Sequence, residues 1–370
     1  MRIGIDFHSV EREGTGNCTY IRSTVESLLE IDDKNEYFLY VVNDKYAYYE
    51  KFRTVKNVFL KPIGVNNPFV RIPLLGFYTF RDKIDILHVQ YIAPPIFRGK
   101  LCLAIHDISF FHFPECFRRF EVYRQRLLLP LNIIRAQRIL VSSQFSKKDL
   151  IDIYNVNGKQ IEVVYCGVKS FFKPLADLEN AKVIMKKYGI FDKFILFVGR
   201  LDTRKNLPVL FKTFNLLKQT KKIPHKLVIV GKKDYLSKHI VKELNSSPYK
   251  KDVIFTGFVE ENSLVLFYNM ADVFIYPSFY EGFGLPCLEA MASGCPVVSS
   301  NNSSLPEVVG SAGILIDPDS VEEIANAIHN IIADVKLRNN FVEKGINQAK
   351  RFDWKKSAIQ LLEIYRGIVK

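Results

Sequence analysis

The sequence predicts an α/β protein of two domains, each a doubly wound parallel sheet with helices on both faces. Three observations support this. The chain has 370 residues, more than one hydrophobic core usually organises. Short runs of Val, Ile, Leu and Phe alternate with longer amphipathic stretches, which is typical of buried parallel strands. The alternation stops at a connector that contains Gly167 and Pro174, and then restarts.

The strands expected in the first half are residues 2–6, 37–42, 85–90, 101–105, 138–142 and 161–165. Those expected in the second half are residues 193–198, 226–230, 253–256, 272–276, 296–299 and 313–316. We therefore expect an N-terminal domain over 1–170 and a C-terminal domain over 171–352, facing each other across a cleft. Residues 353–370 carry apolar side chains at helical spacing, which predicts a helix that returns to the N-terminal domain.

Composition limits the class of partner and the compartment. The net charge of +13 favours an anionic partner, either nucleic acid, an anionic membrane surface or a phosphorylated small molecule. No run of about 20 apolar residues is present and the start reads as a strand, so we expect a cytoplasmic protein. The six cysteines are scattered without a metal-binding spacing, which indicates buried free thiols.

A basic turn follows the strand that ends at Val198. Gly199 leaves room for a ligand, and Arg200 and Lys205 add positive charge before a helix that Asn206 is expected to cap. A guanidinium, an ammonium and helix N–H groups together suit a diphosphate. A solvated basic loop is the alternative.

A glycine-rich turn follows the strand that ends near Pro277. It carries Glu281 and then, seven residues further on, Glu289 in the following helix. Pro286 suits an early helical position, which would put Glu289 in the first turn, and Gly282 and Gly284 let backbone amides meet a ligand. Taken singly, Glu281 is better explained as a surface carboxylate and Glu289 as a favourable charge near a helix start.

Together these segments resemble the signature of retaining nucleotide-sugar glycosyltransferases of the GT4 family, which have the GT-B fold. The resemblance covers residues 194–206, 255–258, the pair Glu281 and Glu289, and residues 304–308 with Gly313 behind them. It implies that Arg200 and Lys205 hold the donor diphosphate and that Glu289 binds the ribose. It further implies contacts to the donor sugar and phosphate from Glu281 and from the backbone of Gly282, Phe283, Gly284 and Leu285. Phe258 would lie near the base.

Two loops of the first half extend the resemblance. His106 and Asp107 follow a buried strand and are similar to the His-Asp loop of mannosyltransferase-like members, in which the histidine contacts the sugar. Without the family, a structural histidine is the more common explanation. The loop over 8–17 contains Gly14 and Gly16 and is similar to the glycine-containing loop that faces diphosphate and acceptor. Its spacing departs from a dinucleotide fingerprint, so NAD binding is disfavoured.

No metal or other cofactor is expected. The D-x-D sequence, Asp317-Pro318-Asp319, follows the last strand, away from the motifs above. Arg200 and Lys205 would take the place of a metal ion at the leaving diphosphate.

The stretch from Arg118 to Arg138 interleaves arginines with aromatic and leucine side chains. One explanation is peripheral binding to the anionic inner face of the membrane. An amphipathic helix with snorkelling arginines on a soluble domain is an equally good explanation.

The resemblance therefore predicts a metal-independent hexosyltransferase in glycan or polysaccharide biosynthesis, with catalytic residues His106, Arg200, Lys205 and Glu281. GDP-mannose is the first donor to test, with UDP-glucose and UDP-N-acetylglucosamine as rivals. The acceptor is a hydroxyl group, with a lipid-linked glycan as one candidate, and no nucleic-acid partner is expected. The alternatives are a GT-B nucleotide-sugar epimerase and a nonenzymatic basic protein that binds nucleic acid or membrane.

Overall fold

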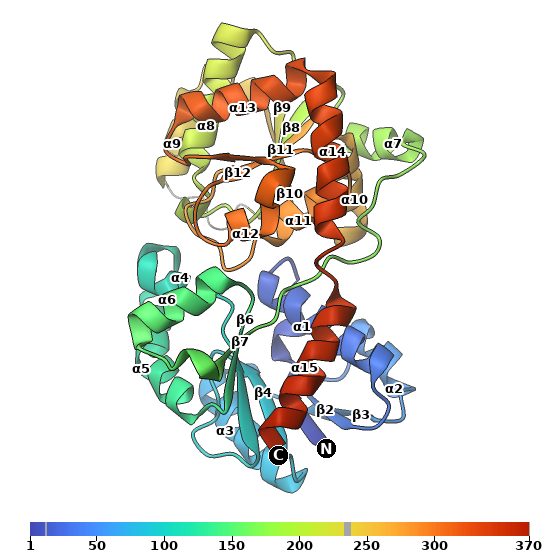
Figure 1. The fold of residues 1–370 in the computed structure, drawn as a ribbon, viewed down its shortest axis with the longest axis vertical. Coiled ribbons are helices and arrows are strands. Elements are labelled where there is room, and N and C mark those ends of the chain that lie inside the picture. The colour runs from blue at the N-terminus through green and yellow to red at the C-terminus, as the bar shows by residue number, and fades with distance from the viewer. Residues whose placement is uncertain (12, 233–237, 370) are drawn as a thin grey trace. The chain divides into compact units, whose positions relative to one another are not determined.

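The computed structural model describes residues 1–11, 13–232 and 238–369. Its chain divides into two compact units (Figure 1). The first comprises Met1–Gly167 and Trp354–Lys370, and the second comprises Val168–Asp353. The sequence analysis ended the N-terminal domain at residue 170 and started the returning C-terminal helix at residue 353.

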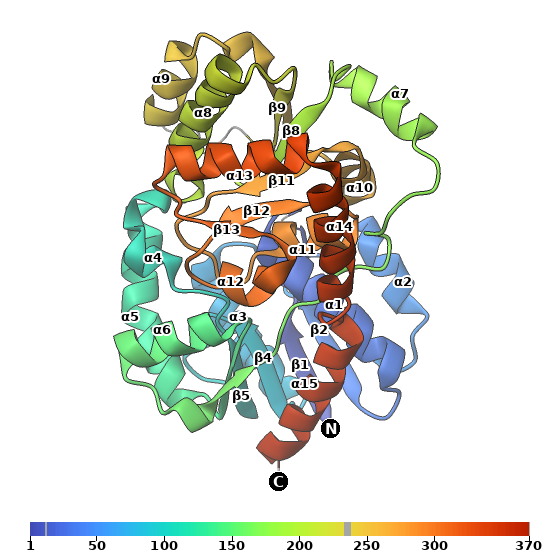
Figure 2. The ribbon, with the colours of Figure 1, turned by 45° about the horizontal axis from the view of Figure 1, so that its top comes forward.

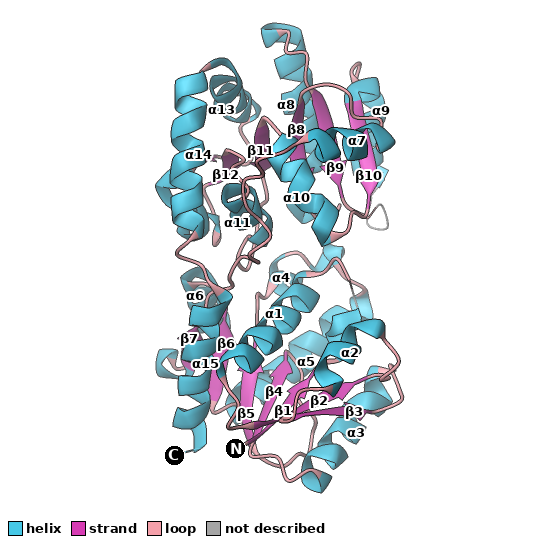
Figure 3. Cartoon of the chain, turned by 90° about the vertical axis from the view of Figure 1, so that its right-hand side faces the viewer, coloured by secondary structure: helices cyan, strands magenta, loops and turns pink. Residues whose placement is uncertain are grey.

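Within the described residues, the first unit contains a seven-stranded parallel sheet in the order β3-β2-β1-β4-β5-β6-β7 (Figure 3). Its strands are β1 (Arg2–Asp6), β2 (Glu36–Val41), β3 (Val58–Pro62), β4 (Ile86–Gln90), β5 (Lys100–Ala104), β6 (Arg138–Val141) and β7 (Ile161–Val163). In register, Ile3 pairs with Tyr37 of β2 on one side and with Ile86 of β4 on the other. The carboxyl ends of these strands therefore meet at one edge.

The main helices of this unit are α1 (Gly16–Ile31), α2 (Glu50–Arg53), α3 (Pro68–Arg81), α4 (Ser109–His112), α5 (Arg119–Arg135), α6 (Gln144–Tyr154) and α15 (Trp354–Val369), with short 3-10 turns η1 (His8–Glu11), η2 (Ala47–Tyr49), η3 (Pro114–Cys116) and η4 (Gly158–Gln160). Leu75 of α3, Leu129 of α5 and Leu150 of α6 share one buried cluster with strand side chains such as Leu87 and Leu103. These three helices therefore cover the same core.

Strand β3 is the one strand that the sequence analysis missed. It lies at the sheet edge beyond β2, its side chains are at most half-buried, and it contains Lys61 and ends at Pro62. Lysine and proline are common on edge strands because they discourage further pairing. Such a strand lacks the continuous apolar run that identified the buried ones.

Helix α15 belongs to the first unit although it follows the second in sequence. It lies beside α1 (Figure 1). Its Ser357 hydroxyl donates to the Tyr165 carbonyl at 2.6 Å, and Gln360 Nε2 donates to the Val163 carbonyl at 2.9 Å. Trp354, Leu361 and Tyr365 are among its buried side chains.

The second unit contains, in its described part, a six-stranded parallel sheet in the order β10-β9-β8-β11-β12-β13. The strands are β8 (Phe194–Val198), β9 (Lys226–Val230), β10 (Val253–Gly257), β11 (Val273–Tyr276), β12 (Val297–Ser300) and β13 (Ile314–Ile316). The helices are α7 (Glu179–Lys187), α8 (Leu207–Leu216), α9 (Lys238–Ser246), α10 (Glu261–Met270), α11 (Leu285–Ala292), α12 (Leu305–Val309), α13 (Val321–Ala333) and α14 (Val335–Ala349), and the short turns are η5 (Thr203–Lys205), η6 (Leu217–Lys221), η8 (Lys250–Asp252) and η9 (Gly310–Ala312). Helix α13 packs across β11, β12 and β13 (Figure 2).

None of the helices in the described residues is both long and apolar enough to cross a bilayer.

Candidate functional site

The candidate donor site is formed by loops at the carboxyl edge of the second sheet. Because β8, β11 and β12 are neighbouring parallel strands, the segments that follow them emerge side by side. In open α/β sheets, ligands bind beyond this edge. The basic turn after β8 and the glutamate-bearing turn after β11 are thus brought together.

Lys205 and Glu281 form a buried ion pair, which the structure records between Lys205 Nζ and Glu281 Oε1. Lys205 is 4% exposed, and its ammonium also donates to the Tyr276 hydroxyl at 2.7 Å. The Ser278 hydroxyl donates to the same Glu281 oxygen. An ammonium has three donors; among the described residues two of them bond to Tyr276 and Glu281, and the third remains for a ligand.

Glu281 is therefore no surface carboxylate. Burial raises the pKa of its carboxyl, but Lys205 and Arg204 lower it further, and the net effect is a pKa below the usual value. Glu281 is therefore ionised at neutral pH. Glu281 can thus fix the position of the Lys205 ammonium next to an anionic ligand.

Two arginines of the β8–α8 turn flank a buried aspartate. Arg200 Nε lies 3.5 Å and Arg204 Nη2 lies 3.7 Å from Asp202 Oδ2. Asp202 is 4% exposed, and within the described residues neither of its oxygens accepts a hydrogen bond. Three cations thus face two carboxylates, Asp202 and Glu281, which leaves one net positive charge for a phosphate group.

The start of α8 differs from the expected cap. Asn206 is the capping residue by position, but its backbone is left-handed, with φ 56°, and its side chain makes no hydrogen bond to the helix. Its amide instead donates to the Pro318 carbonyl at 2.6 Å. Asn206 therefore ties the basic turn to the loop after β13.

The turn after β11 is fixed by its neighbour after β12. The Ser304 hydroxyl lies 2.9 Å from the Glu281 carbonyl and 2.8 Å from the Phe283 carbonyl. Gly284 has φ 107°, and a Cβ there would lie 2.7 Å from the Leu305 side chain. Glycine thus suits the backbone conformation, and any larger residue would also require the Leu305 side chain to shift. Gly282 lies within this turn, whose backbone is held in one shape.

Helix α11 begins at Leu285 with Pro286 in its first turn, which contains no acidic residue. Glu289 therefore lies just after the first turn, where the sequence analysis had placed it inside. The Tyr268 hydroxyl donates to Glu289 Oε2 at 3.0 Å. Burial raises the pKa of the Glu289 carboxyl to about 8, with Glu261 adding to the effect. At neutral pH this group is largely protonated and can both donate and accept a hydrogen bond.

The two phenylalanines of the predicted donor site differ in exposure. Phe258 is 40% exposed, with Lys232 Nζ 5.0 Å from its ring centre. Its open ring can stack on a base. Phe283 is buried against Phe352, with ring centres 5.6 Å apart. Its ring is packed inside the unit, and the backbone contact to the donor that the resemblance implies stays a prediction.

In the first unit, His106 follows β5 at the carboxyl edge of the sheet. Its Nε2 lies 3.0 Å from Gln90 Oε1 at the end of β4, and its ring centre lies 4.2 Å from that of Tyr20. The Ser146 and Ser142 hydroxyls donate to its carbonyl at 3.0 and 3.3 Å. Burial lowers the pKa of the imidazole to about 4, against a smaller opposing effect of Asp107. His106 is therefore neutral at pH 7.

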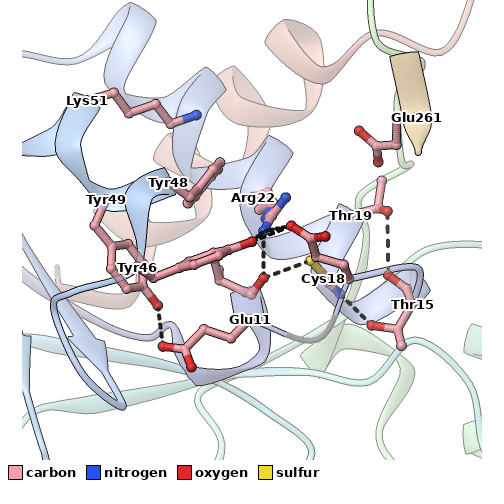
Figure 4. A network of polar contacts seen from close by, with 12 residues as sticks. Glu11, Thr15, Cys18, Thr19, Arg22, Tyr46, Tyr48, Tyr49, Lys51 and Glu261 are labelled. Carbon is pink, nitrogen blue, oxygen red and sulfur yellow. Dashed lines mark hydrogen bonds and ion pairs between the residues drawn. The ribbon is translucent and has the colours of Figure 1, made fainter. Parts of the chain in front are cut away.

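The loop over 8–17 is described except for residue 12. Gly14 has a left-handed backbone with φ 75°, and Gly16 begins α1 after Thr15, whose hydroxyl accepts from Cys18 N at 3.3 Å. Arg22 holds the loop from inside (Figure 4), because its Nη2 donates to the Val10 carbonyl at 2.8 Å and to Glu13 at 3.2 Å. The two glycines thus lie on an anchored loop.

The D-x-D sequence forms a local turn, but it does not lie away from the motifs as the sequence analysis expected, because its Pro318 carbonyl accepts from Asn206 of the basic turn at 2.6 Å. Asp317 and Asp319 are exposed, and the Asp319 amide donates to Asp317 Oδ1 at 3.0 Å. Among the residues that the structure describes, no three His, Cys, Asp or Glu side chains come together as a metal site would require.

Four residues of these sites were missed from sequence. Tyr276 is the last residue of β11, Arg204 lies in the basic turn after β8, and Gln90 ends β4. Gly231 follows β9, and a Cβ there would lie 2.0 Å from the Gly199 carbonyl. A polar residue or glycine at the carboxyl end of a predicted strand was the available signal in all but one case.

The comparisons with known proteins identify the family of this chain. Residues 181–348 match the family described as "Glycosyl transferases group 1" and residues 24–170 match "Glycosyltransferase Family 4". The chain is 32% identical over 290 residues to "O-antigen chain mannosyltransferase B" of Escherichia coli, covering 78% of this chain and 76% of that protein. The chain belongs to the family 4 glycosyltransferases.

Two further relatives of this glycosyltransferase differ in coverage. The "Serotype-specific mannosyltransferase WbdA" of Escherichia coli is 27% identical over 62% of this chain, but the match covers only 28% of that longer protein. The "N-acetylgalactosamine-N,N'-diacetylbacillosaminyl-diphospho-undecaprenol 4-alpha-N-acetylgalactosaminyltransferase" of Campylobacter jejuni is 28% identical, over 99% of this chain and 100% of that one.

Solved structures identify the fold of this glycosyltransferase. Sucrose-phosphate synthase of Thermosynechococcus elongatus matches with a TM-score of 0.77 at 19% identity, covering 99% of this chain and 98% of that one. HepE of Anabaena, solved with UDP-glucose, matches with a TM-score of 0.76 at 19% identity, covering 99% and 100%. These matches confirm the predicted GT-B fold class.

Proposed function

We propose that this glycosyltransferase moves a hexose from a nucleotide-diphosphate sugar to a hydroxyl acceptor with retention of anomeric configuration, and without a metal ion. The observation that carries the proposal is the buried Lys205–Glu281 pair beside Arg200 and Arg204. It concentrates cations at the strand ends where nucleotides bind in such sheets. The family assignment favours this enzyme over a nonenzymatic basic protein.

The chemical step separates the anomeric carbon from the β-phosphate oxygen. Arg200 and the third N–H of Lys205 would bind the diphosphate and stabilise the negative charge that develops on it. The acceptor oxygen then bonds to the anomeric carbon on the same face, and its proton passes to the departing phosphate oxygen. Sugar, proton and electron pairs balance without any further reactant.

We propose mannose as the transferred sugar and GDP-mannose as the donor. The names of two relatives reported above support mannose, while the Campylobacter relative is named for N-acetylgalactosamine transfer. His106 would accept a hydrogen bond from a sugar hydroxyl through Nδ1, since Nε2 is directed at Gln90. Glu289 would bind the ribose, and Phe258 would stack on the base.

The acceptor is proposed to be a lipid-linked glycan at an anionic membrane surface. The Campylobacter relative is named for a diphospho-undecaprenol acceptor. Within this chain, the supporting feature is an exposed apolar surface formed by α3 and α5. Its side chains are each 50–78% exposed: Phe69, Phe77, Phe80, Phe120, Tyr123, Leu127, Leu131 and Ile134.

These residues form one stripe on each helix. On α5 they recur at intervals of three and four, which places them on one side of the helix, and Phe69 of α3 reaches Phe120 of α5 with ring centres 5.5 Å apart. A cavity of about 540 Å³ is lined by residues of both helices, among them Pro68, Phe69, Ile72, Leu128 and Leu131. So large an exposed apolar patch is typical of an interaction site.

Charge favours an anionic bilayer as its occupant. The segment 118–138 has six arginines and one acidic residue, Glu121, and α3 contains no acidic residue. Arg118, Arg119 and Arg126 are exposed. Apolar side chains bordered by arginines suit the boundary between headgroups and acyl chains.

The test of the proposed activity is product formation by the full chain with a panel of donors. GDP-mannose should give the highest kcat/KM, and His106→Ala should lose turnover while keeping GDP affinity. A preference for a UDP-sugar would refute the donor, and unchanged turnover in His106→Ala would make His106 a structural residue. Isomerisation of the nucleotide sugar without acceptor would instead identify an epimerase.

A further inference from the structure

A short polar chain joins η1, β4 and the loop after β5 in the first unit. Gln90 Nε2 lies 2.9 Å from the Ser9 hydroxyl, and Gln90 Oε1 lies 3.0 Å from His106 Nε2. Gln90 is 7% exposed. An amide oxygen only accepts hydrogen bonds, so in this arrangement His106 carries its proton on Nε2.

We propose that Gln90 is a positioning residue that holds His106 as the neutral Nε2–H tautomer, so that Nδ1 presents a lone pair to a substrate hydroxyl. This inference rests on the proposed contact of His106 with the sugar. Among the described residues Nδ1 has no hydrogen-bond partner, which leaves that nitrogen for a ligand.

The backbone around the pair is fixed at both strand ends. Tyr91, directly after Gln90, has the left-handed φ of 62°, which is uncommon for a residue with a side chain. Its amide donates to the Ala104 carbonyl at 3.0 Å, which joins the ends of β4 and β5. The serine contacts to the His106 carbonyl fix the other partner. A strained residue retained beside such a group is common at functional sites.

The groups that face His106 are themselves uncharged, apart from Asp107 on its own loop. Tyr20 packs against the ring from α1, and burial raises the pKa of its hydroxyl far above neutrality. Tyr91 packs from the other side. Burial lowers the pKa of His88 on β4 to about 3. A neutral amide at position 90 thus completes an environment that keeps the imidazole neutral.

The test replaces this amide by a carboxylate in Gln90→Glu. An anion at hydrogen-bond distance should raise the pKa of His106 by about 1 to 3, which would protonate Nδ1 and remove its lone pair in part of the neutral range. We expect kcat to fall by roughly 10- to 100-fold below the new pKa, in the range found for lost partners of metal-bound histidines, and to recover as pH rises. Gln144→Glu, which adds the same charge at an exposed position, is the matched control.

A second measurement reads the tautomer directly. Ring nitrogen shifts of His106 in ¹⁵N-labelled full chain should show Nε2–H in the wild type, and a mixture of tautomers in Gln90→Leu. The Nδ1–H form in the wild type, or a pH profile in Gln90→Glu unchanged from wild type, would overturn the inference. Normal turnover of His106→Ala with the expected tautomer would instead refute the proposed sugar contact and leave the role of Gln90 intact.

Discussion

The imidazole Nδ1 of His88 lies 2.6 Å from the hydroxyl of Tyr365, so a central strand and the last helix share a buried hydrogen bond. His88 is 0% exposed, and within the described residues its Nε2 has no partner. In the part of the chain that the structure describes, the bond to Tyr365 is thus the one hydrogen bond of this ring.

Tyr365→Phe should therefore lower the free energy of unfolding of the first unit by about 1–3 kcal/mol, the cost of an unpaired buried polar group. Trp354, the single tryptophan, lies in α15 and reports this unit by fluorescence during denaturant unfolding. Tyr123→Phe, at a position 72% exposed, is the control. Equal midpoints for the two variants would contradict the prediction.

Arg200→Ala and Lys205→Ala should both lower kcat/KM, because each variant loses roughly 2–4 kcal/mol of transition-state stabilisation. They should differ in stability. Arg200 has a side chain 35% exposed, whereas removing Lys205 leaves Glu281 buried without its cation, which is strongly destabilising. Lys212→Ala on α8, whose side chain is 54% exposed, is the control. Near-normal turnover in both site variants would defeat the assignment.

Turnover should persist in EDTA, because Arg200 and Lys205 are expected to neutralise the leaving diphosphate. The measurement is the initial rate of transfer by protein freed of metals, with and without added Mg²⁺ or Mn²⁺. Complete loss of activity on chelation, restored by either ion, is the opposing result.

Glu289 should make stability depend on pH. A free glutamate has a pKa of 4.5, but burial raises the pKa of the Glu289 carboxyl to about 8. Between these values the unfolded chain binds fewer protons than the folded one, so the contribution of Glu289 to stability is fully present below pH 4.5 and is lost as pH rises through 8. Glu289→Gln should remove this contribution, as seen in Tm measured against pH.

The two glutamates should also separate in kinetics. Glu289→Ala is expected to weaken donor binding through the ribose, and Glu281→Ala to act mainly on kcat. Nucleotide-diphosphate affinity measured by calorimetry checks this. Equal losses of affinity in the two variants would refute the division of roles.

Vesicles that contain anionic phospholipid should bind the protein in a salt-sensitive manner. Each arginine near the membrane surface should contribute about 1 kcal/mol to the binding free energy. Leu127→Glu with Ile134→Glu should abolish co-sedimentation, because both side chains lie on the exposed stripe of α5. Ile359→Glu, on α15 and 47% exposed in the wild type, is the matched control. Loss of binding in the control alone, or no binding by the wild type, would exclude this surface.

The sequence was informative wherever the signal was local. Buried strands produce continuous apolar runs, and the motifs after β8 and β11 are short segments at strand ends, so both could be located. The pairing of Lys205 with Glu281 spans 76 positions, and that of His106 with Gln90 spans 16. Such pairs depend on strand order, which periodicity does not encode.

The sequence analysis also could not predict local geometry that depends on a single residue. The left-handed backbone of Asn206 directs its side chain away from the helix that it precedes. A shift of one helical position moved Glu289 out of the first turn. The edge position of β3 removed the apolar pattern by which the other strands were recognised.

The return of α15 to the first unit affects the order in which the protein can be completed during synthesis. Chains fold from the N-terminus as they emerge from the ribosome, yet the apolar surface of α1 stays uncovered until Trp354–Val369 has been made. The second unit, a continuous segment, has no such dependence. The unit that emerges first is therefore finished last, and in the interval its exposed apolar surface is available to chaperones.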